Sequence, residues 1–158
     1  MPISEEKLEK RAKNILLHQL TRTAKTEHQL REVLVKREIP PDLIDWAIAD
    51  FLRAGLIDDA AYARGFLAAR LARGKAVKLI ARELRQKGVA NTIIEEVCGA
   101  VSQQEQQELA NQLATRRIQR MLSLAPDVRY RRLSGFLMRR GFPSAVVTAA
   151  VRWAEKQG

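Results

Sequence analysis

Apolar residues recur at three- and four-residue intervals along most of the chain, which is the spacing of amphipathic α-helices. Glycine and proline number only 8 and 5 in 158 residues, and they lie between the apolar segments, where they end helices. Segments with the two-residue alternation of a half-buried strand are almost absent. The pattern predicts an all-α protein.

Local signals place several helix ends. Residues Thr26 to Gln29 form a capping box that opens a helix, and Pro40-Pro41 ends it, with the second proline in the first turn of the next helix. Gly55 closes that third helix. Asp58 or Asp59 is expected to cap the helix that follows. The chain therefore reads as short helices joined by tight turns.

The chain contains an internal repeat. Residues 30–47, 80–97 and 133–150 align so that apolar positions coincide, in the columns Leu30/Ile80/Leu133, Leu34/Leu84/Leu137, Ile39/Val89/Phe142 and Ile44/Ile94/Val147. The residue before the third column is Gly88 in one copy and Gly141 in another, as a left-handed helix cap requires. The first copy has Glu38 there, so we predict that it turns differently.

Each copy has room for three short helices, the first supplied by residues 8–20, 59–73 and 104–122. We predict three tandem three-helix repeats over residues 1–57 (with a polar N-terminal segment), 58–103 and 104–158. Because such repeats contact only their neighbours, the expected body is an elongated, curved array.

Charge is strongly segregated within a net surplus of +10. Residues 64–87 carry 8 basic side chains against one acidic, and residues 116–152 carry 9 arginines against one aspartate. Residues 88–115 between them hold 4 glutamates and no basic residue. These two basic blocks favour a polyanion or an acidic protein as partner. The alternative is that each block is only the solvated face of its helices.

The sharpest predicted surface is a stripe at i, i+3, i+7 and i+10, formed by Lys75, Lys78, Arg82 and Arg85. Arginine predominates in the last third of the chain, which suits bidentate recognition of carboxylate or phosphate. We expect a partner- or DNA-binding basic face made of Arg70, Arg73, Lys75, Lys78, Arg82, Arg85, Arg116, Arg117, Arg120, Arg129, Arg131, Arg132, Arg139 and Arg140.

The aromatic residues argue against a dedicated single-strand DNA channel, which would stack bases on exposed rings. Tyr130, between arginines, is the one ring kept as a possible contact. The others are assigned to packing because of their core periodicity: Phe51, Tyr62, Phe66, Phe136 and Phe142, with Trp46 and Trp153 in the core or between repeats.

Little in the chain supports catalysis. His18 and His28 lack metal-ligand spacing, Cys98 is expected to be a buried thiol, and no phosphate-binding loop occurs. The acidic pair Asp58-Asp59 is explained by helix capping, which leaves a metal-dependent nuclease as the weakest alternative. We expect no enzyme activity, cofactor or metal. A single cysteine, a polar N-terminus and no membrane-spanning stretch predict a cytoplasmic protein.

Residues Gly55 to Arg64 (GLIDDAAYAR), followed by Arg73-Gly74-Lys75 and by Ile80 to Val89 (IARELRQKGV), resemble the RecX family of bacterial recombination regulators. Weaker similarity covers residues 10–153 and includes the closing segment Gly135 to Phe142. The chain departs from the family at Ala76-Val77, where glycine and proline are usual.

The resemblance implies tandem three-helix repeats and a non-enzymatic monomer that binds the RecA filament in its groove, with basic residues of the second and third repeats making the contacts. It also implies that RecA ATPase, coprotease and strand-exchange activities in DNA repair and recombination are modulated, mainly inhibited. DNA phosphates within the filament are a possible further contact. The alternative is an autonomous basic DNA-binding module.

Overall fold

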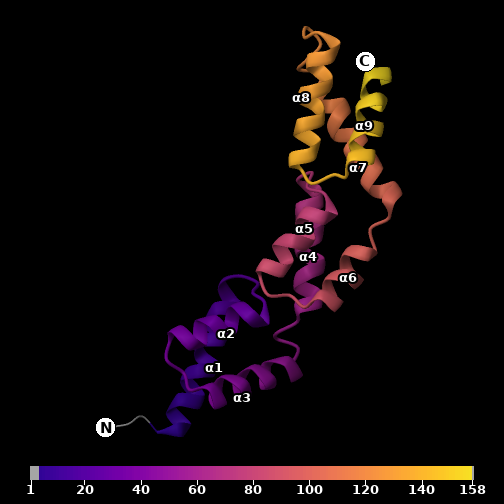
Figure 1. Ribbon diagram of the computed structural model, residues 1–158. Coiled ribbons are helices and arrows are strands. Elements are labelled where there is room, and N and C mark those ends of the chain that lie inside the picture. The colour runs from indigo at the N-terminus through magenta and orange to yellow at the C-terminus, as the bar shows by residue number, and fades with distance from the viewer. Residues whose placement is uncertain (1–3, 158) are drawn as a thin grey trace. The chain divides into compact units, whose positions relative to one another are not determined.

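The computed structural model describes residues 4–157, and within them the chain forms nine α-helices and no strand (Figure 1). This confirms the all-α prediction. The helices are α1 (Glu5–Arg22), α2 (Glu27–Lys36), α3 (Pro41–Arg53), α4 (Asp59–Ala72), α5 (Val77–Gln86), α6 (Asn91–Gly99), α7 (Gln103–Ile118), α8 (Pro126–Arg139) and α9 (Ser144–Gln157).

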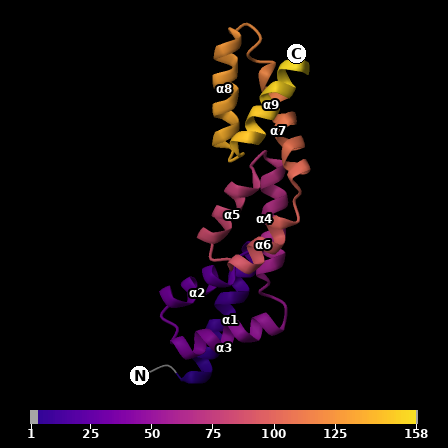
Figure 2. The same ribbon diagram turned by 45° about the vertical axis from the view of Figure 1, so that its right-hand side comes forward.

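The helices group into two compact units. The first unit contains the described residues up to Arg64 together with Leu84–Ile94. The second contains Gly65–Glu83 and the described residues from Glu95 onward. Helices α1, α2 and α3 pack together in the first unit, and α7, α8 and α9 lie side by side in the second (Figures 1 and 2).

The helix starts follow the local sequence. Thr26 accepts from the Gln29 N–H while the Gln29 side chain accepts from the Thr26 N–H, so the predicted capping box is confirmed. Pro41 occupies the first turn of α3, also as predicted. Asp58, and not Asp59, caps α4, since its carboxylate accepts the Ala61 N–H at 3.0 Å. Each of these bonds satisfies a donor that the first helical turn would otherwise leave unpaired.

The repeat columns are the interior of the molecule. All twelve of their residues are buried, and the first two columns, Leu30/Ile80/Leu133 and Leu34/Leu84/Leu137, are fully buried. In the first unit the core also holds Leu16 and Ile48, and in the second it holds Ile118 and Val151. The prediction that the same apolar positions recur in three copies is confirmed.

The turn after the second helix of each repeat corrects one prediction. Glu38 has a φ of +62°, in the left-handed region, as Gly88 and Gly141 do at +85° and +95°. The same hydrogen bonds close all three turns, from Ile39 N–H to Leu34 O, and from the corresponding pairs Val89 to Leu84 and Phe142 to Leu137. The prediction that the first copy turns differently is therefore wrong. Glutamate adopts the glycine conformation because the Schellman bonds and the buried apolar pair on either side fix the turn.

Ala76 and Val77, which replace the glycine and proline usual in the RecX family, both make hydrogen bonds within the second unit. Ala76 is fully buried, and its N–H donates to the Arg140 carbonyl at 2.9 Å. Val77 is the first residue of α5, and its N–H donates to the Gln106 side-chain oxygen at 2.9 Å. A proline tolerates this position but has no N–H. The valine therefore adds a bond between α5 and α7 that a proline could not make.

Three smaller assignments are settled by burial and helix length. Cys98 is buried, as predicted. Trp46 and Trp153 were predicted to lie in the core or between repeats, but they are 38% and 48% exposed, so that prediction is wrong. The ring of Trp46 is covered instead by the ammonium group of Lys13. Helix α7 ends at Ile118 rather than at residue 122, which leaves Arg120 in the following turn. None of the described helices is both long and apolar enough to cross a membrane.

Candidate binding surfaces

The predicted stripe on α5 is shorter than the sequence suggested. Lys75 precedes the helix, which begins at Val77, so only Lys78, Arg82 and Arg85 lie on it. Arg85 donates to the Asn91 side chain at 3.1 Å. Lys78 and Arg82 are exposed, and within residues 4–157 neither has an ion-pair partner. These two residues are the free part of the stripe.

Glu83 holds two members of the predicted basic face. Its carboxylate accepts from Lys75 Nζ at 2.7 Å and from Arg70 Nε at 3.1 Å, and all three side chains are partly buried. Burial by itself raises the pKa of Glu83, but the hydrogen bonds and charges of Lys75 and Arg70 outweigh it and lower that pKa. Arg70 also lies 4.5 Å from the ring centroid of Phe66. Arg70 and Lys75 thus have a structural role within the second unit.

A second group of predicted residues converges where α4, α7 and α8 end, all within the second unit. We call this cavity of about 200 Å³ the arginine pocket; it is lined by Arg73, Leu113, Arg116, Arg117, Arg120, Phe136 and Arg140. The five arginines come from three different helix ends, and the lining contains no carboxylate. The sequence predicted all five as part of the basic face, but it did not indicate that Arg73 and Arg140 lie with the three arginines at the end of α7.

Phe136 forms one wall of the arginine pocket. The guanidinium of Arg117 lies 4.5 Å from its ring centroid and that of Arg140 lies 5.1 Å from it. Such cation–π contacts fix the direction of both side chains. The sequence indicated packing for Phe136, and its ring is half-buried. Helical spacing could have suggested the pair with Arg140, four residues on, but not the contact with Arg117 on another helix.

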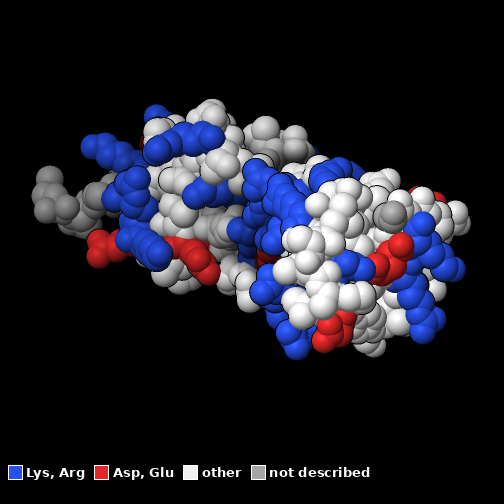
Figure 3. All heavy atoms as spheres, turned by 90° about the horizontal axis from the view of Figure 1, so that it is seen from above, with Lys and Arg blue, Asp and Glu red and all other residues white. Residues whose placement is uncertain are grey.

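The remaining predicted residues do not join the arginine pocket. Arg129 makes a bidentate pair with Glu155, at 3.1 and 3.2 Å, and donates to the Leu124 carbonyl at 2.9 Å. With only 17% of its side chain exposed, it ties α8 to α9. Arg131, Arg132 and Arg139 are exposed. Figure 3 shows Lys and Arg gathered in contiguous groups on the visible face, with few acidic side chains among them.

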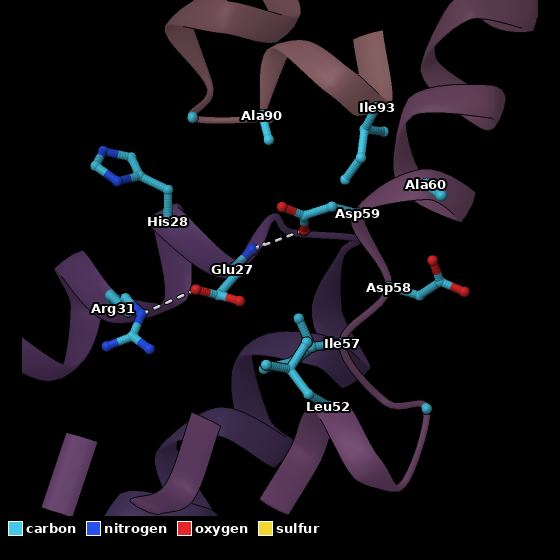
Figure 4. Close-up of a pocket in the computed structure, with 12 residues that line it drawn as sticks. Glu27, His28, Arg31, Leu52, Ile57, Asp58, Asp59, Ala60, Ala90 and Ile93 are labelled. Atoms are coloured by element: carbon cyan, nitrogen blue, oxygen red, sulfur yellow. Dashed lines mark hydrogen bonds and ion pairs between the residues drawn. The ribbon is translucent and has the colours of Figure 1, made fainter. Parts of the chain in front are cut away.

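The acidic pair lies at a different cavity, within the first unit, of about 600 Å³ (Figure 4). The Asp59 carboxylate points toward α2 and accepts the Glu27 N–H at 2.9 Å, whereas Asp58 points away from it. Burial raises the pKa of Asp59, and the nearby carboxylates of Glu27 and Asp58 raise it further, against the effect of the backbone hydrogen bond. Each aspartate caps a helix start, Asp58 that of α4 and Asp59 that of α2.

The described part of the chain contains no group of three or more His, Cys, Asp or Glu side chains placed to hold a metal ion. In Figure 4 the imidazole of His28 points away from both aspartates. It pairs with Glu32 one turn along α2, at 2.6 Å.

Three family models match the chain in succession. They are described as RecX, first, second and third three-helix domain, and they match residues 12–51, 58–97 and 104–151 respectively. Together they cover most of the sequence, and each spans one copy of the repeat.

Curated relatives and solved structures agree with these matches. "Regulatory protein RecX" from Streptomyces coelicolor is 37% identical over 149 residues, which are 93% of this chain and 79% of that protein. The protein of the same name from Thermobifida fusca is 36% identical over 93% of this chain and 80% of its own length. The crystal structure of RecX from Lactobacillus salivarius has the same fold, with a TM-score of 0.87 at 20% identity over 96% of this chain and 99% of that one. The chain belongs to the RecX family of regulatory proteins.

Proposed function

We propose that this protein binds the RecA filament in its groove and modulates, mainly by inhibition, the ATPase, coprotease and strand-exchange activities of RecA. The observation that carries the proposal is the match of all three repeats to the three RecX domains in order. That order supports transfer of the family's role, because the similarity then extends over all three repeats rather than over a single one. The relatives are named regulatory proteins, and we infer a non-enzymatic monomer without a cofactor that acts in the bacterial cytoplasm.

The basic surfaces supply a physical basis for filament binding. Lys78 and Arg82 are exposed and unpaired within the described residues, so they can meet acidic groups of a partner without first breaking an ion pair. If the protein contacts two adjacent RecA protomers at once, it favours the filament conformation in which both protomers are in reach. Such a bias slows the ATP cycle, because the cycle requires the filament to change conformation.

The test is RecA ATP hydrolysis on single-stranded DNA, measured with increasing amounts of this protein. We expect hydrolysis to fall as the protein is added. The double variant Lys78→Glu, Arg82→Glu should lose this effect, whereas Arg152→Glu, Lys156→Glu should keep it. The control pair lies on α9, is exposed and changes the net charge equally.

Two results would contradict the proposal. An unchanged rate at several-fold excess of the wild-type protein would refute RecA regulation itself. Salt-dependent binding to naked DNA, without any effect on RecA, would instead favour an autonomous DNA-binding module. If the stripe variant and the control inhibit equally, RecA regulation stands and the assignment of Lys78 and Arg82 is wrong.

A further inference from the structure

The arginine pocket concentrates more positive charge than its surroundings neutralise. Its five guanidinium groups have no ion-pair partner among residues 4–157. The one hydrogen bond from this set runs from Arg140 Nη1 to the Arg73 carbonyl, at 2.8 Å, and a carbonyl carries no net charge. The pocket is therefore a region of strong positive potential.

Helix dipoles compensate only part of this positive charge. Arg73, Arg117 and Arg140 lie at the ends of α4, α7 and α8, where cations complement the helix dipoles. Each helix C-terminus is equivalent to roughly −0.5 of an elementary charge, so three ends supply roughly −1.5. Against five arginines, most of the positive charge remains uncompensated. Arg116 shares the last turn of α7 with Arg117, and Arg120 follows that helix; both side chains are exposed and have no ion-pair partner among the described residues.

The size of the site and its donors favour a phosphate over a larger anion or a carboxylate. A volume of about 200 Å³ is below the roughly 300–1,000 Å³ of pockets that enclose whole drug-sized ligands, so it admits one charged group rather than a whole molecule. The five arginines come from three helix ends, and together they offer more N–H donors than the two oxygens of one carboxylate can accept, which favours a phosphate group. Guanidinium forks bind phosphate through paired N–H groups, and all five basic residues here are arginine.

Two of the arginines are already oriented for such a ligand. Phe136 holds Arg117 and Arg140 by their ring contacts, so part of the conformational entropy of ordering them is lost before a ligand arrives. Arg116 and Arg120 remain free to close on the anion. We propose that the arginine pocket is a phosphate-binding site, which takes a backbone phosphodiester of single-stranded DNA or a phosphate of a free polyphosphate.

The experiment contains no RecA, so its result is independent of the function proposed above. The probe for the nucleic-acid source is a fluorescent 20-nucleotide oligothymidylate, with binding followed by anisotropy over a range of salt concentrations. The probe for the free source is inorganic pyrophosphate, with binding followed by the rise in unfolding temperature. The pocket variant is Arg116→Gln, Arg120→Gln, and the matched control is Arg152→Gln, Lys156→Gln.

With the oligonucleotide, the pocket variant should bind about 10-fold more weakly than wild type, the loss expected for charge-assisted hydrogen bonds to one phosphate. The slope of log affinity against log salt should become shallower by about 0.7, the value for the counterions released when one single-strand phosphate is neutralised. With pyrophosphate at tenfold excess over its dissociation constant, wild type and control should melt about 3 °C higher. The pocket variant should show no such rise.

The two arms identify the source of the phosphate. A pocket-dependent loss with the oligonucleotide alone assigns the site to a DNA phosphodiester, and a pocket-dependent rise with pyrophosphate alone assigns it to a free polyphosphate. Losses in both arms, with pyrophosphate displacing the oligonucleotide, assign one site to both. The proposal is overturned if the pocket variant and the control behave alike in both arms, since the effect would then be one of total charge.

Discussion

Replacing Glu38 by glycine should stabilise the first unit, because Glu38 is held at a backbone φ of +62°. A residue with a Cβ in the left-handed region is destabilised by roughly 1–2 kcal/mol relative to the right-handed one. Glycine avoids this strain but loses about 0.5–1 kcal/mol more conformational freedom on folding. Glu38 is exposed and has no ion-pair partner among the described residues, so its side chain contributes little. We expect Glu38→Gly to raise the unfolding free energy by about 0.5–1 kcal/mol.

Urea unfolding followed by tryptophan fluorescence measures this change. Trp46 lies on α3 in the same unit as Glu38, and Trp153 lies on α9 in the other unit. A Trp153→Phe background therefore makes the fluorescence report the first unit alone. The variant should shift the midpoint to higher urea with an unchanged slope, as expected for a change in stability and not in the denatured state.

Two further substitutions at the same position separate strain from charge. Glu38→Ala removes the carboxylate but keeps the Cβ, so it should not stabilise. Glu38→Asn should fall between alanine and glycine, because asparagine tolerates the left-handed region better than other residues with a Cβ. If alanine stabilises as much as glycine, or if glycine destabilises, backbone strain at Glu38 is not the cause.

Three other predictions concern stability. Gly88→Ala should destabilise the first unit by about 2–4 kcal/mol, because the new Cβ would be strained at positive φ and would also overlap His28. Chemical denaturation measures this loss, and a decrease in the free energy of unfolding of less than about 1 kcal/mol would contradict it. Burial disfavours the ionised form of Asp59, so wild type should lose stability as pH rises from the ordinary aspartate pKa through the raised pKa of the folded state. The asparagine side chain does not titrate, so the unfolding temperature of Asp59→Asn should rise relative to that of wild type over this pH range. A constant difference between the two unfolding temperatures from about pH 3 to pH 8 would refute this. Glu83→Gln should lose about 1–2 kcal/mol at neutral pH, and this loss should vanish as pH falls through the lowered pKa of Glu83, as differential melting across acid pH can check.

The fold could be predicted from the sequence because its signals are local and repeated. A capping box, a proline in a first turn and a glycine after a last turn each act within about four residues, so their effect does not depend on distant packing. The three-fold recurrence of the buried columns then gave the number of repeats. Glu38 shows the limit of this reasoning, because a residue type that disfavours the left-handed region was overruled by the hydrogen bonds and apolar contacts around it.

The candidate sites could be predicted only as sets of residues. Whether an arginine is free depends on which side chains the fold brings near it, and those lie far away in sequence. Glu155 reaches Arg129 from 26 residues on, and Arg140 reaches the Arg73 carbonyl across 67. Lys75 was assigned to a helical stripe because its spacing fits, yet the helix begins two residues later. Sequence spacing fixes the face of a helix but not its first residue or its tertiary partners.

Pairing within the fold divides the predicted basic face into two kinds of residue. Arg70, Lys75 and Arg129 are held by carboxylates and stabilise the second unit. The arginine pocket has no such partner, and its like charges repel one another in the free protein. Unpaired charge of one sign lowers the stability of the folded state and attracts the opposite sign. A bound anion relieves that repulsion only in the folded protein, where the arginines are together. The cluster of unpaired arginines therefore lowers the stability of the free protein and, for the same reason, makes it bind anionic partners selectively.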